Sequence, residues 1–213
     1  MGRVQDRFNE IVAFGRDAGL RIPEWRGPSV EEAAAVLEER FGFEVHEHAV
    51  DWYAVTAGSH GVAESFLCEL GDGYVFDPAP TAPHLIDAQD VFLEGLGMAL
   101  ETVPAALRAQ LTDLVLPLAT DYGEWLFLCE LEAGTPPVVA FYNELHVNDL
   151  TIYHVKNGDG EMSPCTLPDL LEERLQAIAE GLVYVDLSQS TRNFTVDRDR
   201  MSSSHHFYPH KAS

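Results

Sequence analysis

The chain has 213 residues, of which 46% are hydrophobic and 23% charged, and its 35 acidic and 13 basic side chains give a net charge of −22. This composition is that of a globular protein long enough to bury a core. Between residues 31 and 180 there are 28 acidic and only four basic side chains. Such an acidic body repels phosphate, which argues against direct binding of nucleic acid or of an anionic membrane surface and favours a basic protein as partner.

The cysteines and the apolar runs indicate the cellular compartment in which the protein is expected to reside. Cys68, Cys129 and Cys165 show no paired spacing, which favours a reducing environment over a disulfide framework. Charged residues interrupt the first apolar positions, and no stretch approaches the ~18 apolar residues of a membrane span. We therefore expect a cytoplasmic protein without a signal peptide.

The first part of the chain predicts three helices. Apolar residues recur at helical spacing in each of them, and Gly19 is a suitable end for the first. Ser29 followed by Glu32 is a capping-box pattern at the start of the second. The expected ranges are 3–18, 29–41 and 47–56.

The middle of the chain predicts short strands separated by turns. Gly71-Asp72-Gly73 between two apolar runs is a hairpin signal. Residues 124–131 place apolar side chains on both faces, which is typical of a central strand. Two helical patterns cover 87–96 and 104–113. The expected strands are 63–70, 74–77, 114–119, 124–131, 138–142 and 150–155.

The last part of the chain predicts a closing helix over 167–180, with Pro168 and Asp169 in its first turn, and a strand over 183–187. Helices, then an antiparallel meander, then a helix indicate an α+β domain over 1–187, with helices 29–41 and 167–180 packed on one sheet. Residues 188–213 are rich in Ser, Thr, Arg and His and are expected to be a weakly structured extension. The apolar residues able to dock it are Phe194, Phe207 and Tyr208.

Several segments between residues 25 and 180 follow one family pattern. Pro28-Ser29-Val30 opens a helix that closes on Phe41-Gly42, and Leu116-Pro117-Leu118 begins a strand, turn and strand ending at Trp125. The remaining segments are 51–58, 137–139 and 167–175. On these residues the chain resembles the SUKH superfamily, the group of Smi1/Knr4-like proteins, although Ala57 stands where that pattern has Asn.

The resemblance implies a small sheet-and-helix domain without catalysis. Many members are immunity proteins that bind and block toxins, often nucleases or nucleotide-modifying enzymes, and others are scaffolds or regulators. The acidic body of this chain is complementary to the basic surface that a nucleic-acid-targeting toxin needs. We therefore expect an immunity protein that binds a basic toxin. An intracellular scaffold of the same fold is the alternative, and a small hydrolase using acidic residues is a second one.

Two predicted turns combine acids with aromatic side chains, and such turns project from a rigid sheet. Tyr and Trp are frequent binding hot spots, and neighbouring acids would steer a basic partner. The expected partner-binding residues are Glu69, Asp72, Asp121, Glu124 and the anchors Tyr122 and Trp125.

We expect no catalytic residue, metal or cofactor. His46 and His48 have a spacing that could hold a metal, but no HExxH pattern or Cys/His quartet accompanies them. Cys68 and Cys129 lie in apolar strand patterns, where cysteine is usually a small core residue. The tail histidines, which would chelate only weakly, are His205, His206 and His210.

Overall fold

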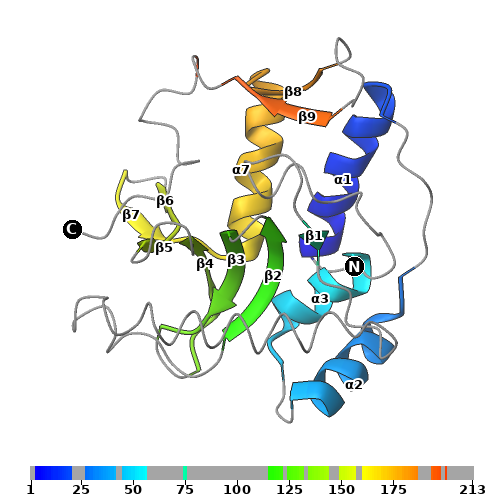
Figure 1. Ribbon diagram of the computed structural model, residues 1–213, viewed down its shortest axis with the longest axis vertical. Coiled ribbons are helices and arrows are strands. Elements are labelled where there is room, and N and C mark those ends of the chain that lie inside the picture. The colour runs from blue at the N-terminus through cyan, green and yellow to red at the C-terminus, as the bar shows by residue number, and fades with distance from the viewer. Residues whose placement is uncertain are drawn as a thin grey trace.

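The computed structural model describes residues 3–20, 27–41, 45–56, 74–75, 115–121, 124–131, 134–143, 149–156, 160–186, 193–197 and 200. Within them the chain is a mixed α+β protein of helices and antiparallel strands, which confirms the expected class (Figure 1). The helices are α1 (Arg3–Asp17), α2 (Val30–Phe41), α3 (Glu47–Thr56) and α7 (Leu167–Ala179). The strands are β1 (Tyr74–Val75), β2 (Val115–Asp121), β3 (Glu124–Cys129), β4 (Val138–Asn143), β5 (Asp149–Ile152), β6 (His154–Lys156), β7 (Met162–Pro164), β8 (Val183–Asp186) and β9 (Asn193–Val196).

The helix ends follow the expected signals. The chain leaves α1 through Gly19, whose φ of 97° suits glycine, and the Leu20 N–H donates to the Gly15 carbonyl at 2.9 Å. Ahead of α2, the Glu32 N–H donates to Ser29 Oγ at 3.2 Å and the Ser29 N–H donates to Glu32 Oε2 at 2.8 Å. The predicted capping box of α2 is therefore confirmed.

The main sheet is an antiparallel meander in the order β1-β2-β3-β4-β5. Its register shifts by one residue between Pro117 and Ala119, so Leu118 is the extra residue of a β-bulge in β2. Proline cannot donate a ladder hydrogen bond, which explains why the irregularity falls beside Pro117. The bulge leaves Leu118 completely buried.

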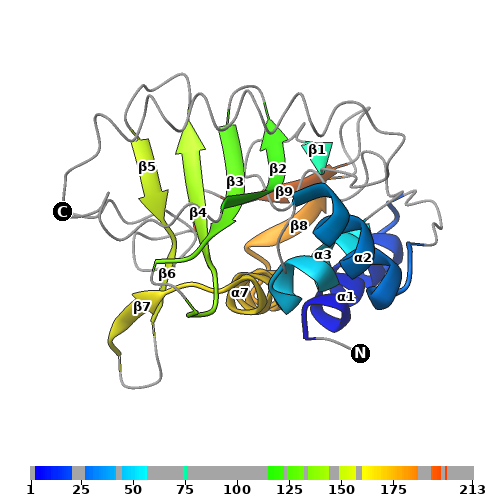
Figure 2. The ribbon, with the colours of Figure 1, turned by 90° about the horizontal axis from the view of Figure 1, so that it is seen from below.

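The helices form a second layer. Figure 2 shows the five strands side by side, with α7 on one side of them and the three N-terminal helices grouped beside α7. α1 packs on both α7 and α3, whereas α2 packs mainly on α3. The expectation that helix 29–41 packs on the sheet is thus corrected. Its buried side chains are Ala33 and Leu37, and the element that α2 mainly contacts is the helix α3.

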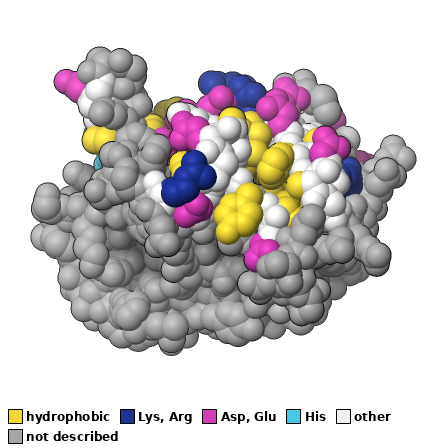
Figure 3. All heavy atoms as spheres, turned by 90° about the horizontal axis from the view of Figure 1, so that it is seen from above, with side chains coloured by type: hydrophobic (Ala, Val, Ile, Leu, Met, Phe, Trp, Pro, Cys, Tyr) yellow, Lys and Arg dark blue, Asp and Glu magenta, His cyan; other side chains and the backbone are white. Residues whose placement is uncertain are grey.

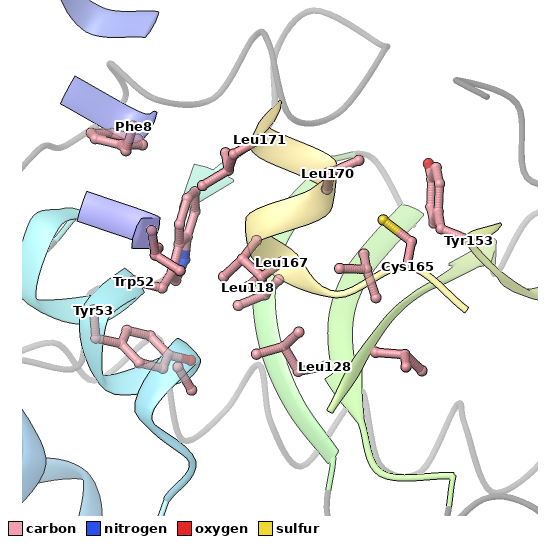
Figure 4. Packing of buried hydrophobic residues seen from close by; sticks show 14 of the residues in the cluster. Phe8, Trp52, Tyr53, Leu118, Leu128, Tyr153, Cys165, Leu167, Leu170 and Leu171 are labelled. Carbon is pink, nitrogen blue, oxygen red and sulfur yellow. The ribbon is translucent and has the colours of Figure 1, made fainter. Parts of the chain in front are cut away.

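The core lies where these layers meet. Trp52 and Tyr53 of α3 are fully buried, and the Trp52 ring meets Phe8 of α1 edge to face at 5.5 Å between centroids. In Figure 4, Leu118 from the sheet lies close to Leu167 of α7, and the Trp52 ring lies between α1 and α7. Both faces of the central strands are occupied, since the consecutive residues Leu128 and Cys129 are at most 1% exposed. This confirms the expected central strand.

The strand expected over 150–155 is two strands in separate sheets. Between them the Tyr153 N–H donates to the Val139 carbonyl at 3.0 Å, and the Tyr153 carbonyl accepts from the Cys165 N–H at 2.8 Å. These bonds tie β4 to the segment that leads into α7. Beyond Tyr153 the chain continues as β6, which pairs with β7 in a hairpin that the sequence analysis did not foresee.

Part of the segment expected to be weakly structured is a strand. β9 pairs antiparallel with β8, and Phe194 is only 6% exposed, with its ring centroid 6.1 Å from that of Phe14. The Asp197 N–H donates to the Leu182 carbonyl at 2.8 Å, and Arg200 donates to the carbonyls of Glu180 and Gly181 at the end of α7. Asn193–Val196, Asp197 and Arg200, which lie beyond the expected domain end at residue 187, therefore contact β8 and the end of α7, and the domain boundary itself stays a prediction.

Other expectations lie outside the described residues: the strand over 63–70, the helices over 87–96 and 104–113, and the tail residues Phe207 and Tyr208. Of the strand expected over 74–77, the structure describes β1.

Candidate protein-binding surface

The expected partner-binding residues are described in part. The backbone of Asp121, Glu124 and Trp125 is placed in β2 and β3. Glu69, Asp72 and Tyr122 lie outside the described residues.

The register of the sheet aligns acidic positions at one of its ends. Asp121 lies directly opposite Glu124, Glu124 opposite Asn143, and Asn143 opposite Asp149. We call these four residues, Asp121, Glu124, Asn143 and Asp149, the sheet-end row. Figure 2 shows that the ends of β2 and β4 and the starts of β3 and β5 lie together, at the end of the sheet farther from α7.

Sequence reasoning found two members of the sheet-end row and missed Asn143 and Asp149. The signal for them was weak but present, because Asn143 directly follows one expected strand and Asp149 directly precedes another. Their alignment depends on how β4 and β5 pair, and periodicity within one strand does not give that register.

A second row, one residue farther into the sheet, is rich in aromatic positions. Trp125 pairs with Thr120 on one side and with Tyr142 on the other, and Thr120 pairs with Tyr74 of β1. Aromatic residues are enriched at protein interfaces and carry much of the binding energy there. Acidic and aromatic positions therefore occupy adjacent rows of the same sheet end.

The opposition of Asp121 and Glu124 is unfavourable for the isolated fold. Like charges at directly opposed positions destabilise an antiparallel pair, whereas opposite charges stabilise it by roughly 0.2–1 kcal/mol. A register that opposes two acidic positions in this way breaks a local rule, and departures of this kind concentrate at functional sites.

The helical layer carries a second acidic surface. Four acidic side chains of α2 are exposed. They are Glu31, Glu32, Glu38 and Glu39. Because they lie on a different element from the sheet-end row, they offer a matched comparison for any effect of charge alone.

The described cysteines are buried core residues. Burial raises the pKa of the Cys129 thiol to about 12, and burial also raises that of Cys165, with Asp169 adding to the effect. Both thiols are therefore protonated at neutral pH, a state in which cysteine is a poor nucleophile. Cys68 lies outside the described residues.

The two histidines considered for metal binding are close together. The ring centroids of His46 and His48 are 4.6 Å apart. Among the residues that the structure describes, no group of three or more His, Cys, Asp or Glu side chains is arranged to hold a metal ion. The tail histidines lie outside those residues.

Comparisons of this chain with protein-family models, with curated proteins and with solved structures find no match. None of the described helices has the length and apolar character needed to cross a membrane.

Proposed function

We propose that the chain is a non-catalytic acidic binding protein whose sheet-end row contacts a basic protein partner. The observation that carries this proposal is the direct opposition of Asp121 and Glu124, in register with Asp149 and beside the row of Trp125 and Tyr142. A cationic side chain placed between the two opposed acids would turn a repulsion into two attractions.

Charge supports the same conclusion at longer range. The excess of acidic side chains gives the molecule a negative field, which speeds the encounter with a basic partner and disfavours an acidic one. Exposed charges mainly affect the association rate, so the acids are expected to act chiefly on the encounter with the partner.

The specific role we propose is that of an immunity protein with a SUKH-like fold, which neutralises a basic, nucleic-acid-targeting toxin. Its support is the resemblance over residues 25–180 and the charge complementarity to such a toxin. An intracellular scaffold of the same fold is the alternative. Both roles use the same surface, so the partner distinguishes them.

A growth assay separates the two roles. The product of the gene immediately upstream of this chain's gene is expressed alone, with the wild-type chain, and with the double variant Asp121→Lys, Glu124→Lys. Immunity predicts growth arrest by the upstream product, rescue by wild type and loss of rescue by the variant. A harmless upstream product argues against immunity and favours the scaffold.

The double variant is suited to this assay because it replaces two opposed acids by two opposed lysines. The like-charge opposition remains, so the stability of the β2–β3 hairpin is expected to change little. The single variant Asp121→Lys instead creates an attractive pair with Glu124, and we expect it to stabilise the unbound protein by roughly 0.2–1 kcal/mol.

The control is the variant Glu38→Lys, Glu39→Lys on α2. It changes the net charge by the same amount at two exposed positions away from the sheet end. Full rescue by this control together with loss of rescue by the sheet-end variant supports the proposed surface. The opposite pattern would move the interface to α2.

A further inference from the structure

The first turns of three helices meet around His48. This half-buried residue lies in the first turn of α3, and it interacts electrostatically with Asp169 in the first turn of α7 and with Arg3 at the start of α1. The other charged or titratable groups that act on it are its chain neighbours Glu47 and His46. The protonation state of the His48 imidazole is therefore expected to affect how α1, α3 and α7 pack against one another.

His46 acts as the N-cap of α3. The His48 backbone N–H donates to His46 Nδ1 at 3.1 Å, and the His46 carbonyl accepts from the Ala49 and Val50 N–H groups at 3.0 and 3.2 Å. An Nδ1 atom that accepts a hydrogen bond holds a lone pair, so the ring is neutral with its proton on Nε2. Protonation of His46 would remove this acceptor and place a cation at the positive end of the helix dipole.

His48 adds a second penalty for protonation. The two rings contact edge to face at 4.6 Å, and His48 Nδ1 is buried without a hydrogen-bond partner in the part of the chain that the structure describes. Burial lowers the pKa of His48 and the neighbouring His46 lowers it further, against the opposing effect of Glu47 and Asp169. The packed helices therefore disfavour the protonated form of His48.

The helix that these residues begin carries the centre of the helical layer. Trp52 and Tyr53 are fully buried, and Gln5 of α1 donates to Asp51 of α3 at 3.3 Å. We propose that His46 and His48 form a proton-operated latch, which holds the first turn of α3 against α1 and α7 when both rings are neutral and loosens it when they are protonated.

The pH window follows from the direction of the His48 shift. A histidine whose pKa is lower in the folded protein than its unfolded value of 6.5 contributes stability that is present above pH 6.5 and is lost as the pH falls. Two carboxyl groups work in the opposite direction. Burial raises the pKa of Asp51 in α3 and that of Glu173 in α7, so both favour the folded state on acidification. The effect of the latch is therefore the difference in the free energy of unfolding between each variant and wild type at the same pH.

His154 provides an internal control. Its Nδ1 lies 2.9 Å from the Ile152 carbonyl, so this ring must donate from Nδ1, and the bond survives protonation. The structure thus assigns opposite neutral tautomers to His46 and His154. Imidazole nitrogen shifts in the nuclear magnetic resonance spectrum distinguish them without any mutation.

The experiment measures urea unfolding at pH 7.5 and pH 5.0 for wild type, His46→Asn, His46→Ala and His154→Asn, together with the wild-type histidine tautomers. Asn caps a helix without titrating, so we expect His46→Asn to be as stable as wild type at pH 7.5. At pH 5.0 the folded-to-unfolded ratio of His46→Asn should be roughly fivefold higher than that of wild type. His46→Ala should be less stable at pH 7.5 and approach wild type at pH 5.0. His154→Asn, at a position outside the three helices, should not reproduce the gain of His46→Asn.

Two results would overturn the latch. One is an unchanged ratio between His46→Asn and wild type across this pH range. The other is a neutral His46 with its proton on Nδ1, and this spectroscopic result is decisive even if a variant fails to fold.

Discussion

Glu173 is a half-buried carboxyl group on α7 whose ionisation opposes folding. Burial raises its pKa to about 7 from an ordinary 4.5; the buried Arg174 opposes this rise and Asp169 adds to it. Because the folded-state pKa is the higher one, the contribution of Glu173 to stability is fully present below pH 4.5 and is lost as the pH rises to 7. The substitution Glu173→Gln removes the ionisable group and keeps its shape.

The magnitude follows from the shift. At 1.36 kcal/mol per unit, the rise would correspond to about 3 kcal/mol for a fully enclosed group. Glu173 is partly exposed, so solvent screening reduces the gain to roughly 1–2 kcal/mol. We therefore expect Glu173→Gln to raise the free energy of unfolding by that amount at pH 8.5 and to leave it unchanged at pH 4. The melting temperature at pH 8.5 should rise by roughly 2–8 °C for a chain of this size.

Urea and thermal unfolding of both proteins at the two pH values measure the effect. Glu172→Gln is the matched control, because Glu172 is 52% exposed and pairs with Arg7 at 2.6 Å. Its loss should cost up to about 1 kcal/mol and give no gain at high pH. Equal stability of wild type and Glu173→Gln at pH 8.5 would refute the burial argument, as would a less stable variant there.

Three further substitutions test the packing. Leu171→Ala removes a fully buried side chain of α7 and should lower the free energy of unfolding by about 2–5 kcal/mol. The control Val30→Ala, at a 41% exposed position, should change it by less than about 0.5 kcal/mol. If urea unfolding shows similar losses for both variants, the core has been placed wrongly. Arg200→Ala removes the donors to the Glu180 and Gly181 carbonyls at 3.2 and 3.0 Å and should cost roughly 1 kcal/mol, with faster amide exchange at the end of α7. Unchanged exchange there would mean that residue 200 does not hold the helix end.

Local patterns were sufficient to predict the four described helices, α1, α2, α3 and α7. Ser29 and Glu32 form the expected capping box, and the apolar stripe of α1 is buried as its spacing predicts. These features depend on residues within a few turns of one another. The packing partner of α2 is not encoded locally. The prediction that this helix packs on the sheet was wrong, because α2 packs mainly on α3.

The strand pattern was predicted less completely, for a physical reason. Residues 150–155 read as one strand, but Tyr153 makes its backbone hydrogen bonds with Val139 and Cys165, which are distant in the sequence. Similarly, Phe194 alternates with polar neighbours over only four residues, and the composition of this segment predicted a weakly structured extension. The segment is instead a strand, which pairs with β8 and places Phe194 against Phe14.

The candidate surface was predicted in part. Asp121 and Glu124 were identified from their place beside a turn, and their direct opposition follows from the two-residue gap between β2 and β3. Asp149 joins them only through the pairing of β4 with β5. Such register is a property of the assembled sheet.

The most direct test of the central claim is the association rate with the product of the upstream gene, measured at 0.05 M and 0.5 M salt. Wild type is compared with the sheet-end variant Asp121→Lys, Glu124→Lys and with the α2 variant Glu38→Lys, Glu39→Lys. Salt screens charge beyond about 10 Å at 0.1 M, so steering by the sheet-end row should be strong at low salt and weak at high salt. We predict that the sheet-end variant associates roughly tenfold more slowly than wild type at 0.05 M salt, that the α2 variant is affected far less, and that the rates converge at 0.5 M. Equal rates for wild type and the sheet-end variant at low salt would contradict the proposed binding surface.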